Sequence, residues 1–368
     1  MRIMAVFGTR PEAIKMCPLI LELKQRKNFD CLICLTGQHK DMLSSIMDCF
    51  GLVEDFNLEI MKKNQTLTDI TTSILIKLQS LLIEYKPDIV LVHGDTTTSF
   101  AAALAAFYQQ IPVGHVEAGL RTWRKYSPYP EEMNRCIISK IATYHFAPTK
   151  QNENNLLEEN IKSNVYVTGN TVIDALKTTV RANYQFKEKC LNEIDSEYKY
   201  ILLTAHRREN IGVPLENICK AVLRIIGDKK IRVIYPVHPN PKVREIVYKY
   251  LNDNEQIILT EPIDVLDMHN LIEKCFLVMT DSGGLQEEAP ALHKPVVVLR
   301  KETERQEAID AGTALLAGVE EDNIYKVVSE ILYNEETYKK MSNSVNPYGD
   351  GNASIYIADV LEKVKNTL

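Results

Sequence analysis

Several common signatures of cofactor and metal chemistry are missing from this 368-residue sequence. No G-x-G-x-x-G segment is present, which argues against a dinucleotide cofactor. No G-x-x-x-x-G-K-[ST] segment is present either, which argues against a P-loop phosphoryl-transfer enzyme. The histidines are dispersed, and the sequence has no His-x-x-x-His, no paired Cys-x-x-Cys and no EF-hand loop. We therefore expect no metal site and no cofactor.

The chain also lacks long apolar runs and blocks of like charge. Nowhere are there about 18 uninterrupted apolar residues, and the sequence enters a predicted strand at once, without the two regions of a signal peptide. The formal net charge of −6 disfavours nucleic acid or an anionic membrane as the main partner. We therefore expect a cytoplasmic protein with no nucleic-acid or membrane partner.

Eight cysteines are scattered along the chain, and only Cys31 and Cys34 form a Cys-x-x-Cys pair. This pair lies within a predicted strand, where residues three apart point to opposite faces and cannot chelate one ion. Apolar positions in the core are the better interpretation of both residues.

Short apolar strands alternate with helices along the whole chain. Strands are predicted at 3–7, 31–35, 88–92, 111–116, 144–147, 164–168, 200–204, 231–236, 257–259, 276–280 and 296–299. Such alternation specifies parallel sheets covered by helices on both faces. The sequence therefore predicts an α/β fold of two Rossmann-like, doubly wound domains, residues 1–170 and 171–352, with a cleft between them. A C-terminal helix within residues 353–368 is expected to return to the first domain.

Two carboxylates follow neighbouring predicted strands of the first domain. Asp95 comes after the strand at 88–92, and Glu117 comes after the strand at 111–116. Ligands bind at the carboxyl edge of open α/β sheets, so both acids are placed as site residues. The alternatives are that Asp95 caps a helix and that Glu117 is a solvated loop acid.

Three further residues of the first half are candidates for the same edge. Arg10 and Lys15 belong to a glycine-containing turn and the helix that follows it, an arrangement that binds anions, although both could simply be solvated. Glu131 opens a helix after a long irregular segment. Acids are common at helix starts for structural reasons, but this segment is long enough to place Glu131 over the edge that carries Asp95 and Glu117.

The strand ends of the second half are also rich in polar side chains. His206 and Arg207 follow one strand, and the turn formed by Ser282, Gly283 and Gly284 follows another and opens a helix. Backbone N–H groups at such a helix start can bind a phosphate. Glu288 lies one turn deeper and could accept hydrogen bonds from both hydroxyls of a ribose, and Arg305 adds a cation. A nucleotide site explains this set better than an ordinary tight turn.

Collinear motifs covering essentially the whole chain resemble those of a known family. They lie at 8–12 with Lys15, 36–39, 93–98, 115–121, 130–132 with 134–135, 168–170, 206–210, 281–284 with 286–288, and 303–305. With them the chain resembles the bacterial non-hydrolysing UDP-N-acetylglucosamine 2-epimerases. The resemblance implies the two-domain GT-B fold, a homodimer, no cofactor, and UDP-GlcNAc, UDP-ManNAc and UDP as ligands.

The resemblance also implies a reaction and roles for the candidate residues. UDP is eliminated to leave 2-acetamidoglucal and is then re-added, which supplies ManNAc units for surface polysaccharides. Asp95, Glu117, Glu131 and His206 correspond to catalytic residues of the family. Its substrate-binding residues correspond to Arg10, Lys15, Asp95, Glu117, His206, Met268, Ser282, Gly283, Gly284, Glu288 and Arg305. A regulatory second UDP-GlcNAc site would use Gln38, Arg207, Glu209 and His238.

Some positions depart from the family pattern, and other functions stay open. Gln306 stands where the family usually has proline, Pro239 where it has leucine, and Met268 where phenylalanine is common near the uracil. In the regulatory pocket, Asp41 and Asn64 stand where glutamine and, in some members, arginine are expected. The alternatives are a GT-B glycosyltransferase, a hydrolysing epimerase that releases ManNAc, and an inactive nucleotide-sugar-binding regulator.

Overall fold

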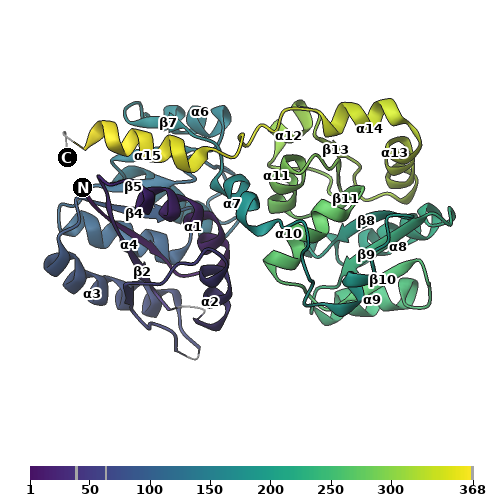
Figure 1. The fold of residues 1–368 in the computed structure, drawn as a ribbon, viewed down its shortest axis with the longest axis horizontal. Coiled ribbons are helices and arrows are strands. Elements are labelled where there is room, and N and C mark those ends of the chain that lie inside the picture. Colours follow the sequence, from purple (N-terminus) through teal and green to yellow (C-terminus); the bar gives the residue numbers. More distant parts are fainter. Residues whose placement is uncertain (38–39, 63, 366–368) are drawn as a thin grey trace. The chain divides into compact units, whose positions relative to one another are not determined.

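The computed structural model describes residues 1–37, 40–62 and 64–365. The chain folds into two compact units (Figure 1). Unit 1 comprises Met1–Thr178 and Tyr348–Leu368, and unit 2 comprises Thr179–Pro347. Along the described part of the chain, no helix combines the length and the apolarity that a membrane span requires.

Unit 1 is built on a seven-stranded parallel sheet with the order β3-β2-β1-β4-β5-β6-β7. Its strands are β1 (Arg2–Phe7), β2 (Asp30–Leu35), β3 (Phe56–Asn57), β4 (Ile89–His93), β5 (Val113–Val116), β6 (Tyr144–Ala147) and β7 (Val165–Val167). The strand order reverses between β1 and β4, which pair directly. This reversal is the topological switch point, where doubly wound sheets bind ligands.

Helices cover both faces of this sheet. They are α1 (Arg10–Gln25), α2 (Lys40–Cys49), α3 (Leu67–Tyr85), α4 (Thr97–Tyr108), α5 (Glu131–Ile141), α6 (Lys150–Glu158), α7 (Thr171–Thr179) and α15 (Ala353–Val364). The helices α3, α4 and α5 pack together on one face, and α1, α2 and α15 pack on the other. The small side chains of α4, such as Ala102 and Ala106, let α3 approach closely and bury Ile74, Leu78 and Leu82.

The C-terminal helix α15 returns to unit 1 and lies beside α1 (Figure 1). Arg26 at the end of α1 forms ion pairs with Asp359, at 2.7 Å, and Glu362, at 3.2 Å. At the other end of α15, the carboxylate of Asp174 in α7 accepts hydrogen bonds from the backbone amides of Ala353, at 3.2 Å, and Ser354, at 2.7 Å. These bonds satisfy amides at the helix start that have no partner within the helix.

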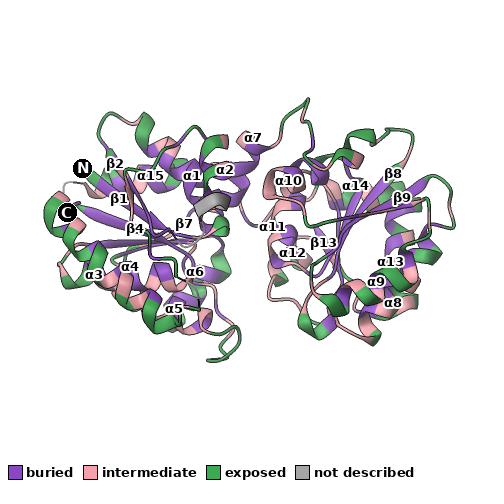
Figure 2. Cartoon of the chain, turned by 90° about the horizontal axis from the view of Figure 1, so that it is seen from below, coloured by how far each residue is buried: buried purple, intermediate pink, exposed green. Residues whose placement is uncertain are grey.

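Unit 2 repeats the same topology with the order β10-β9-β8-β11-β12-β13. Its strands are β8 (Lys199–Thr204), β9 (Ile231–Pro236), β10 (Ile257–Thr260), β11 (Leu277–Thr280), β12 (Val296–Val298) and β13 (Ala314–Leu316). All of these pairings are parallel, and the switch point lies between β8 and β11. Figure 2 shows that the central strands of both sheets are largely buried and that most exposed residues lie on the helices and loops.

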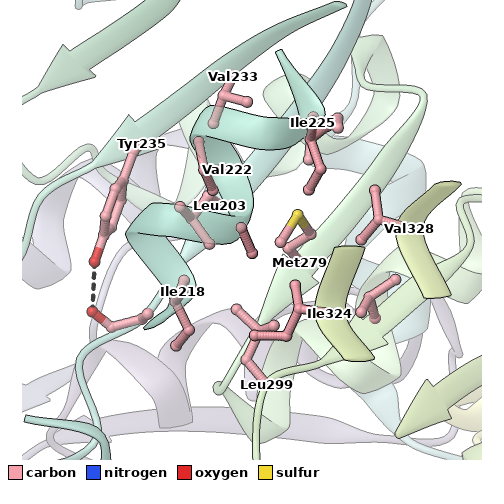
Figure 3. Close-up of a cluster of buried hydrophobic side chains, with 14 of the residues drawn as sticks. Leu203, Ile218, Val222, Ile225, Val233, Tyr235, Met279, Leu299, Ile324 and Val328 are labelled. Atoms are coloured by element: carbon pink, nitrogen blue, oxygen red, sulfur yellow. Dashed lines mark hydrogen bonds between the residues drawn. The ribbon is translucent and has the colours of Figure 1, made fainter. Parts of the chain in front are cut away.

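The helices of unit 2 pack against its sheet and bury the hydrophobic core of the unit. They are α8 (Val213–Ile225), α9 (Pro241–Leu251), α10 (Val265–Lys274), α11 (Gly283–Ala291), α12 (Gln306–Asp310), α13 (Glu321–Tyr333) and α14 (Glu335–Ser342). Figure 3 shows side chains of α8 and α13, among them Val222 and Val328, meeting strand residues such as Leu203 and Met279. Tyr235 is the one labelled aromatic residue there, and its hydroxyl donates a hydrogen bond of 2.6 Å to a backbone carbonyl, that of Ala205.

The predicted fold class is confirmed: both sheets are parallel, and both have the Rossmann strand order. Cys31 and Cys34 are buried in β2, as their interpretation as core residues requires. The sequence did not reveal β3, β13 or the helices α12, α13 and α14. The two strands are two and three residues long, too short for a periodic pattern to be recognised.

Candidate active site

Three carboxylates lie at or near the carboxyl edge of the unit 1 sheet, and we call Asp95, Glu117 and Glu131 the carboxylate cluster. Asp95 follows β4, Glu117 directly follows β5, and Glu131 is the first residue of α5. The charges of Glu117 and Glu131 both act on Asp95, because each raises the pKa of its carboxyl group. The structure therefore brings together the three acids that the sequence singled out.

Glu117 is surrounded by polar groups from three other parts of the chain, α1, β4 and the loop before α7. One carboxylate oxygen, Oε1, accepts hydrogen bonds from Lys15 Nζ and, at 3.0 Å, from Asn170 Nδ2. The other oxygen, Oε2, lies 3.6 Å from His93 Nε2. Burial lowers the pKa of His93 to about 4, although Glu117 acts in the opposite direction. At neutral pH His93 is therefore an uncharged neighbour of Glu117, and the positive charge beside this acid comes from Lys15.

The backbone around Glu117 brings the carboxylate close to the neighbouring strand end. Glu117 has a φ of 60°, in the left-handed region that few non-glycine residues adopt. Gly94, which follows β4, has a φ of 62°, and a Cβ added there would lie 3.2 Å from Glu117 Oε2. The carbonyl of Gly94 lies 2.7 Å from His115 Nε2, which fixes the turn that carries Asp95. Burial lowers the pKa of His115 to about 3, so this buried ring is neutral.

Asp95 is paired with a cation but keeps a raised pKa. Its carboxylate contacts Arg135, a buried residue of α5, and its backbone carbonyl accepts a 2.9 Å hydrogen bond from Asn134 Nδ2. Burial raises the pKa of Asp95, Arg135 opposes this shift, and Glu117 and Glu131 add to it. The N-cap of α4 is Thr96, so helix capping does not account for Asp95.

Glu131 and Glu132 are adjacent in sequence but have different surroundings. Both oxygens of Glu132 accept a hydrogen bond from the Thr122 amide at 3.1 Å, and the Trp123 amide also donates to Glu132 at 3.0 Å. Glu132 therefore fixes the loop before α5. Glu131 Oε2 is buried and has no hydrogen-bond partner among the described residues. Of the two acids that begin α5, Glu131 therefore remains the candidate site residue.

Glu12 joins the two turns of the switch point, a role that the sequence analysis missed. This residue is almost fully buried and accepts hydrogen bonds from the Gly8 amide at 3.0 Å and the Thr9 amide at 2.7 Å. The hydroxyls of Thr96 and Ser99, at the start of α4, donate to its other oxygen at 2.6 and 2.9 Å. The Thr-x-x-Glu capping box was the signal that could have revealed Glu12.

The two cations predicted near this edge differ in their surroundings. Lys15 contacts Glu117 and is largely buried with it, each side chain being 17% exposed. Arg10, the first residue of α1, is exposed. The structure therefore places Lys15 in the carboxylate cluster and leaves Arg10 at the surface of the same turn.

The switch point of unit 2 is organised by a buried aspartate, Asp281, which follows β11. Its Oδ2 accepts hydrogen bonds from the backbone amides of His206 at 2.7 Å and Arg207 at 2.8 Å, and from Asn210 Nδ2 at 3.0 Å. The His206 ring lies 3.5 Å from Asp281 Oδ1 and stacks on the His238 ring, with 5.2 Å between their centroids. Burial lowers the pKa of His206, although Asp281 opposes this shift.

The start of α11 is joined to the loop after β12 by a fully buried amide. Gln286 Nε2 donates to the carbonyl of Ser282 at 3.2 Å, and Gln286 Oε1 accepts a 2.8 Å hydrogen bond from the hydroxyl of Thr303. Arg305, two residues further on, is paired through Nε with the buried Glu287. Ser282 is the N-cap of α11 but makes no side-chain capping bond. These contacts hold Ser282, the glycines that follow it and Arg305 in one region of unit 2.

Two other predicted binding residues belong to the helices α10 and α11. Glu288 of α11 is 15% exposed, and its Oε2 lies 3.5 Å from Nε2 of the buried His269 in α10. Met268, next to His269, is half-buried. Gln286 belongs to one of the family motifs, but the sequence analysis assigned it no role, and His269 was not identified from the sequence at all. The roles of both residues depend on contacts that motif spacing does not indicate.

The four residues proposed for regulation can be placed only in part. Arg207 Nη2 lies 3.8 Å from Glu304, Glu209 pairs with Arg300 at 3.3 Å, and His238 is exposed. Gln38 lies outside the residues that the structure describes. Within the described ranges, no group of three or more His, Cys, Asp or Glu side chains could hold a metal ion.

The fold and the polar edges define a class of protein: a Rossmann-like α/β protein of two units, each with polar side chains at the switch point of its sheet. The UDP-N-acetylglucosamine 2-epimerase family model matches residues 21–362. A UDP-N-acetylglucosamine 2-epimerase of Bacillus subtilis is 54% identical over 98% of this chain and 95% of its own length. The chain belongs to the UDP-N-acetylglucosamine 2-epimerase family.

Solved structures agree with this assignment. The Neisseria meningitidis UDP-GlcNAc 2-epimerase, solved bound to UDP-GlcNAc, is 47% identical and has a TM-score of 0.88, with 99% of this chain and 100% of that chain covered. An S. aureus protein solved with UDP is 46% identical, with the same TM-score, and the match covers 100% of this chain and 97% of that chain.

Proposed function

We propose that this chain catalyses the reversible epimerisation of UDP-N-acetylglucosamine to UDP-N-acetylmannosamine by elimination and re-addition of UDP. The observation that carries the proposal is the carboxylate cluster, in which one acid faces a lysine, one has a raised pKa and one has an unbonded buried oxygen. Reversal of configuration at a carbon requires proton removal on one face and delivery on the other. Three acids in different electrostatic surroundings suit that task.

The proposed reaction has two steps. A carboxylate takes the C2 proton, the C2 electron pair forms a double bond to C1, and the C1–O bond breaks to release UDP and 2-acetamidoglucal. In the second step, C2 receives a proton on its other face and a UDP oxygen forms the new bond to C1. Asp95 is suited to carry a proton because its pKa is raised, and Glu117 accepts donors as an ionised carboxylate does.

The leaving diphosphate needs positive charge and oriented N–H donors. The amides at the start of α11 and the Arg305 guanidinium are suited to this role. Lys15 and Arg10 are proposed as substrate-binding residues because the resemblance implies it. His206, neutral because of its lowered pKa, could donate or accept a hydrogen bond at the diphosphate. Glu288 is proposed to accept the ribose hydroxyls.

The test is epimerisation in D₂O. The purified chain should convert UDP-GlcNAc to UDP-ManNAc with one deuterium at C2, seen as loss of the C2 proton signal by NMR and as a mass increase in the product. Free ManNAc as the product would instead identify a hydrolysing epimerase. UDP binding without deuterium uptake or turnover would identify a binding protein.

A matched variant tests the role of the carboxylate cluster. Asp95→Asn preserves the shape of the side chain but cannot carry the proton, so it should bind UDP normally and lose most turnover. An unchanged kcat would remove Asp95 from the mechanism. The supply of ManNAc units to surface polysaccharides and the homodimer are further parts of the proposal, supported by the resemblance, and light scattering on the purified chain would test the dimer.

A further inference from the structure

His269 is completely buried in unit 2 and has two polar neighbours. Its Nδ1 lies 2.8 Å from the hydroxyl oxygen of Thr179, and its Nε2 lies 3.5 Å from Glu288 Oε2. Nε2 forms no hydrogen bond with any residue in the described part of the chain. A buried ring nitrogen that faces a carboxylate at this distance would form a normal hydrogen bond after a shift of about half an ångström.

The neighbours of the ring determine which nitrogen carries the proton. If Nε2 were unprotonated, its lone pair would face the negative charge of Glu288. The tautomer with hydrogen on Nε2 removes this repulsion, and Nδ1 then accepts the hydrogen bond from the Thr179 hydroxyl. Thr179 thus fixes the ring in the orientation that points an N–H group at Glu288.

The position of Glu288 gives this contact a functional meaning. A Cβ added to Gly284 would lie 3.3 Å from Glu288 Oε1, so this oxygen lies over the glycine in the first turn of α11. The other oxygen faces His269. The carboxylate therefore has one oxygen toward the proposed nucleotide-binding turn and the other toward a buried donor.

We propose that His269 is a positioning residue that holds the Glu288 carboxylate in the orientation that accepts the ribose hydroxyls of the ligand. This inference rests on the proposed binding of a uridine nucleotide. When a ribose draws Glu288 Oε1, the Nε2–H of His269 can donate a hydrogen bond to the second oxygen and keep the carboxylate in this orientation. His269 thereby favours ligands with ribose hydroxyls without touching them.

The test compares two ligands and two variants. UDP and 2′,3′-dideoxyuridine 5′-diphosphate differ only in the ribose hydroxyls, and their affinities are measured by calorimetry. His269→Asn places its amide near the Nδ1 position and loses the donor at Nε2, whereas His269→Gln can place an N–H near the Nε2 position. Thermal unfolding of both variants reports whether the buried substitution disturbs the fold.

The inference predicts a ligand-specific loss. His269→Asn should bind UDP about tenfold more weakly, as expected for one hydrogen bond to a charged group, and should bind the dideoxy ligand like the wild type. His269→Gln should retain most of the preference for UDP. In a Glu288→Gln background, His269→Asn should cause little further loss.

Other outcomes would overturn the inference. An equal loss of affinity for both ligands would show that His269 has only a packing role, and no loss for either would show that it does not position Glu288. A wild-type chain that binds no UDP would refute the proposed function, and the inference with it. A wild type that prefers UDP over the dideoxy ligand while His269→Asn keeps the full preference would refute the positioning role alone.

Discussion

Gly94 offers a direct test of whether the position of Glu117 matters. The residue has a φ of 62°, and an added Cβ would lie 3.2 Å from Glu117 Oε2, closer than ordinary van der Waals contact. Gly51, in an exposed turn after α2, has the same φ of 62° and nothing within 4 Å of the added Cβ. Gly94→Ala and Gly51→Ala therefore share the backbone perturbation, and only the first disturbs the carboxylate cluster.

The backbone part of the effect should be similar in both variants. Alanine in the left-handed region costs about 1–2 kcal/mol of the free energy of unfolding. The smaller entropy of the unfolded chain offsets about 0.4–1 kcal/mol of this cost. The backbone change should therefore lower the free energy of unfolding of both variants by about 0–1.6 kcal/mol and leave them folded at 25 °C.

The catalytic part should differ sharply. In Gly94→Ala, the methyl group pushes Glu117 Oε2 away by a few tenths of an ångström, while Lys15 and Asn170 hold the other oxygen. A misplaced reacting group costs on the order of 10–100-fold in rate, so kcat should fall by about that factor in Gly94→Ala and stay near the wild-type value in Gly51→Ala. UDP affinity should be unchanged in both variants.

The measurements are the initial rate of C2 deuterium incorporation, UDP affinity by calorimetry, and unfolding in urea. The reasoning would be refuted if both variants lost activity equally, since the backbone would then be the cause. Full activity in Gly94→Ala would equally refute it, because the geometry of Glu117 would then not limit the reaction.

Three further predictions concern residues that hold the two edges. Glu12→Ala should lower the free energy of unfolding by about 3–5 kcal/mol. Glu12→Gln should lower it by only about 1 kcal/mol, because the side-chain amide can still form hydrogen bonds with the two backbone amides and the two hydroxyls. Urea unfolding measures both losses, and equal losses would contradict this prediction. Arg135→Met removes the cation that opposes the raised pKa of Asp95, so the limb of the kcat–pH profile that Asp95 governs should move to higher pH, whereas Arg135→Lys should leave it nearly in place. Gln286→Leu should weaken UDP binding about tenfold with little change in kcat, and a fall in kcat alone would argue against its role at the start of α11.

The sequence identified strand ends better than side-chain contacts. Asp95 and Glu117 could be found because buried parallel strands are continuous apolar runs, so the first polar residue after each run marks the carboxyl edge. The contact of Arg135 with Asp95 could not be found, since it depends on the direction in which α5 crosses this edge. The left-handed φ of Glu117 could not be predicted either, because glutamate, unlike glycine or asparagine, rarely adopts this conformation.

The hydrogen-bond donors around each carboxylate distinguish the structural acids from the candidate catalytic acids. Glu12 and Glu132 accept backbone N–H groups and thereby fix turns, in addition to the hydroxyls that donate to Glu12 and the Arg135 guanidinium that donates to Glu132 at 3.2 Å. The backbone bonds could not be released during a reaction without disturbing the fold. Asp95 and Glu117 contact the side-chain cations Arg135 and Lys15, and Glu131 Oε2 is buried without a hydrogen-bond partner among the described residues. Side-chain partners can move with a proton while the backbone stays in place. Glu131 and Glu132 are the same residue type one position apart, so only their partners distinguish the candidate catalytic acid from the acid that holds the loop.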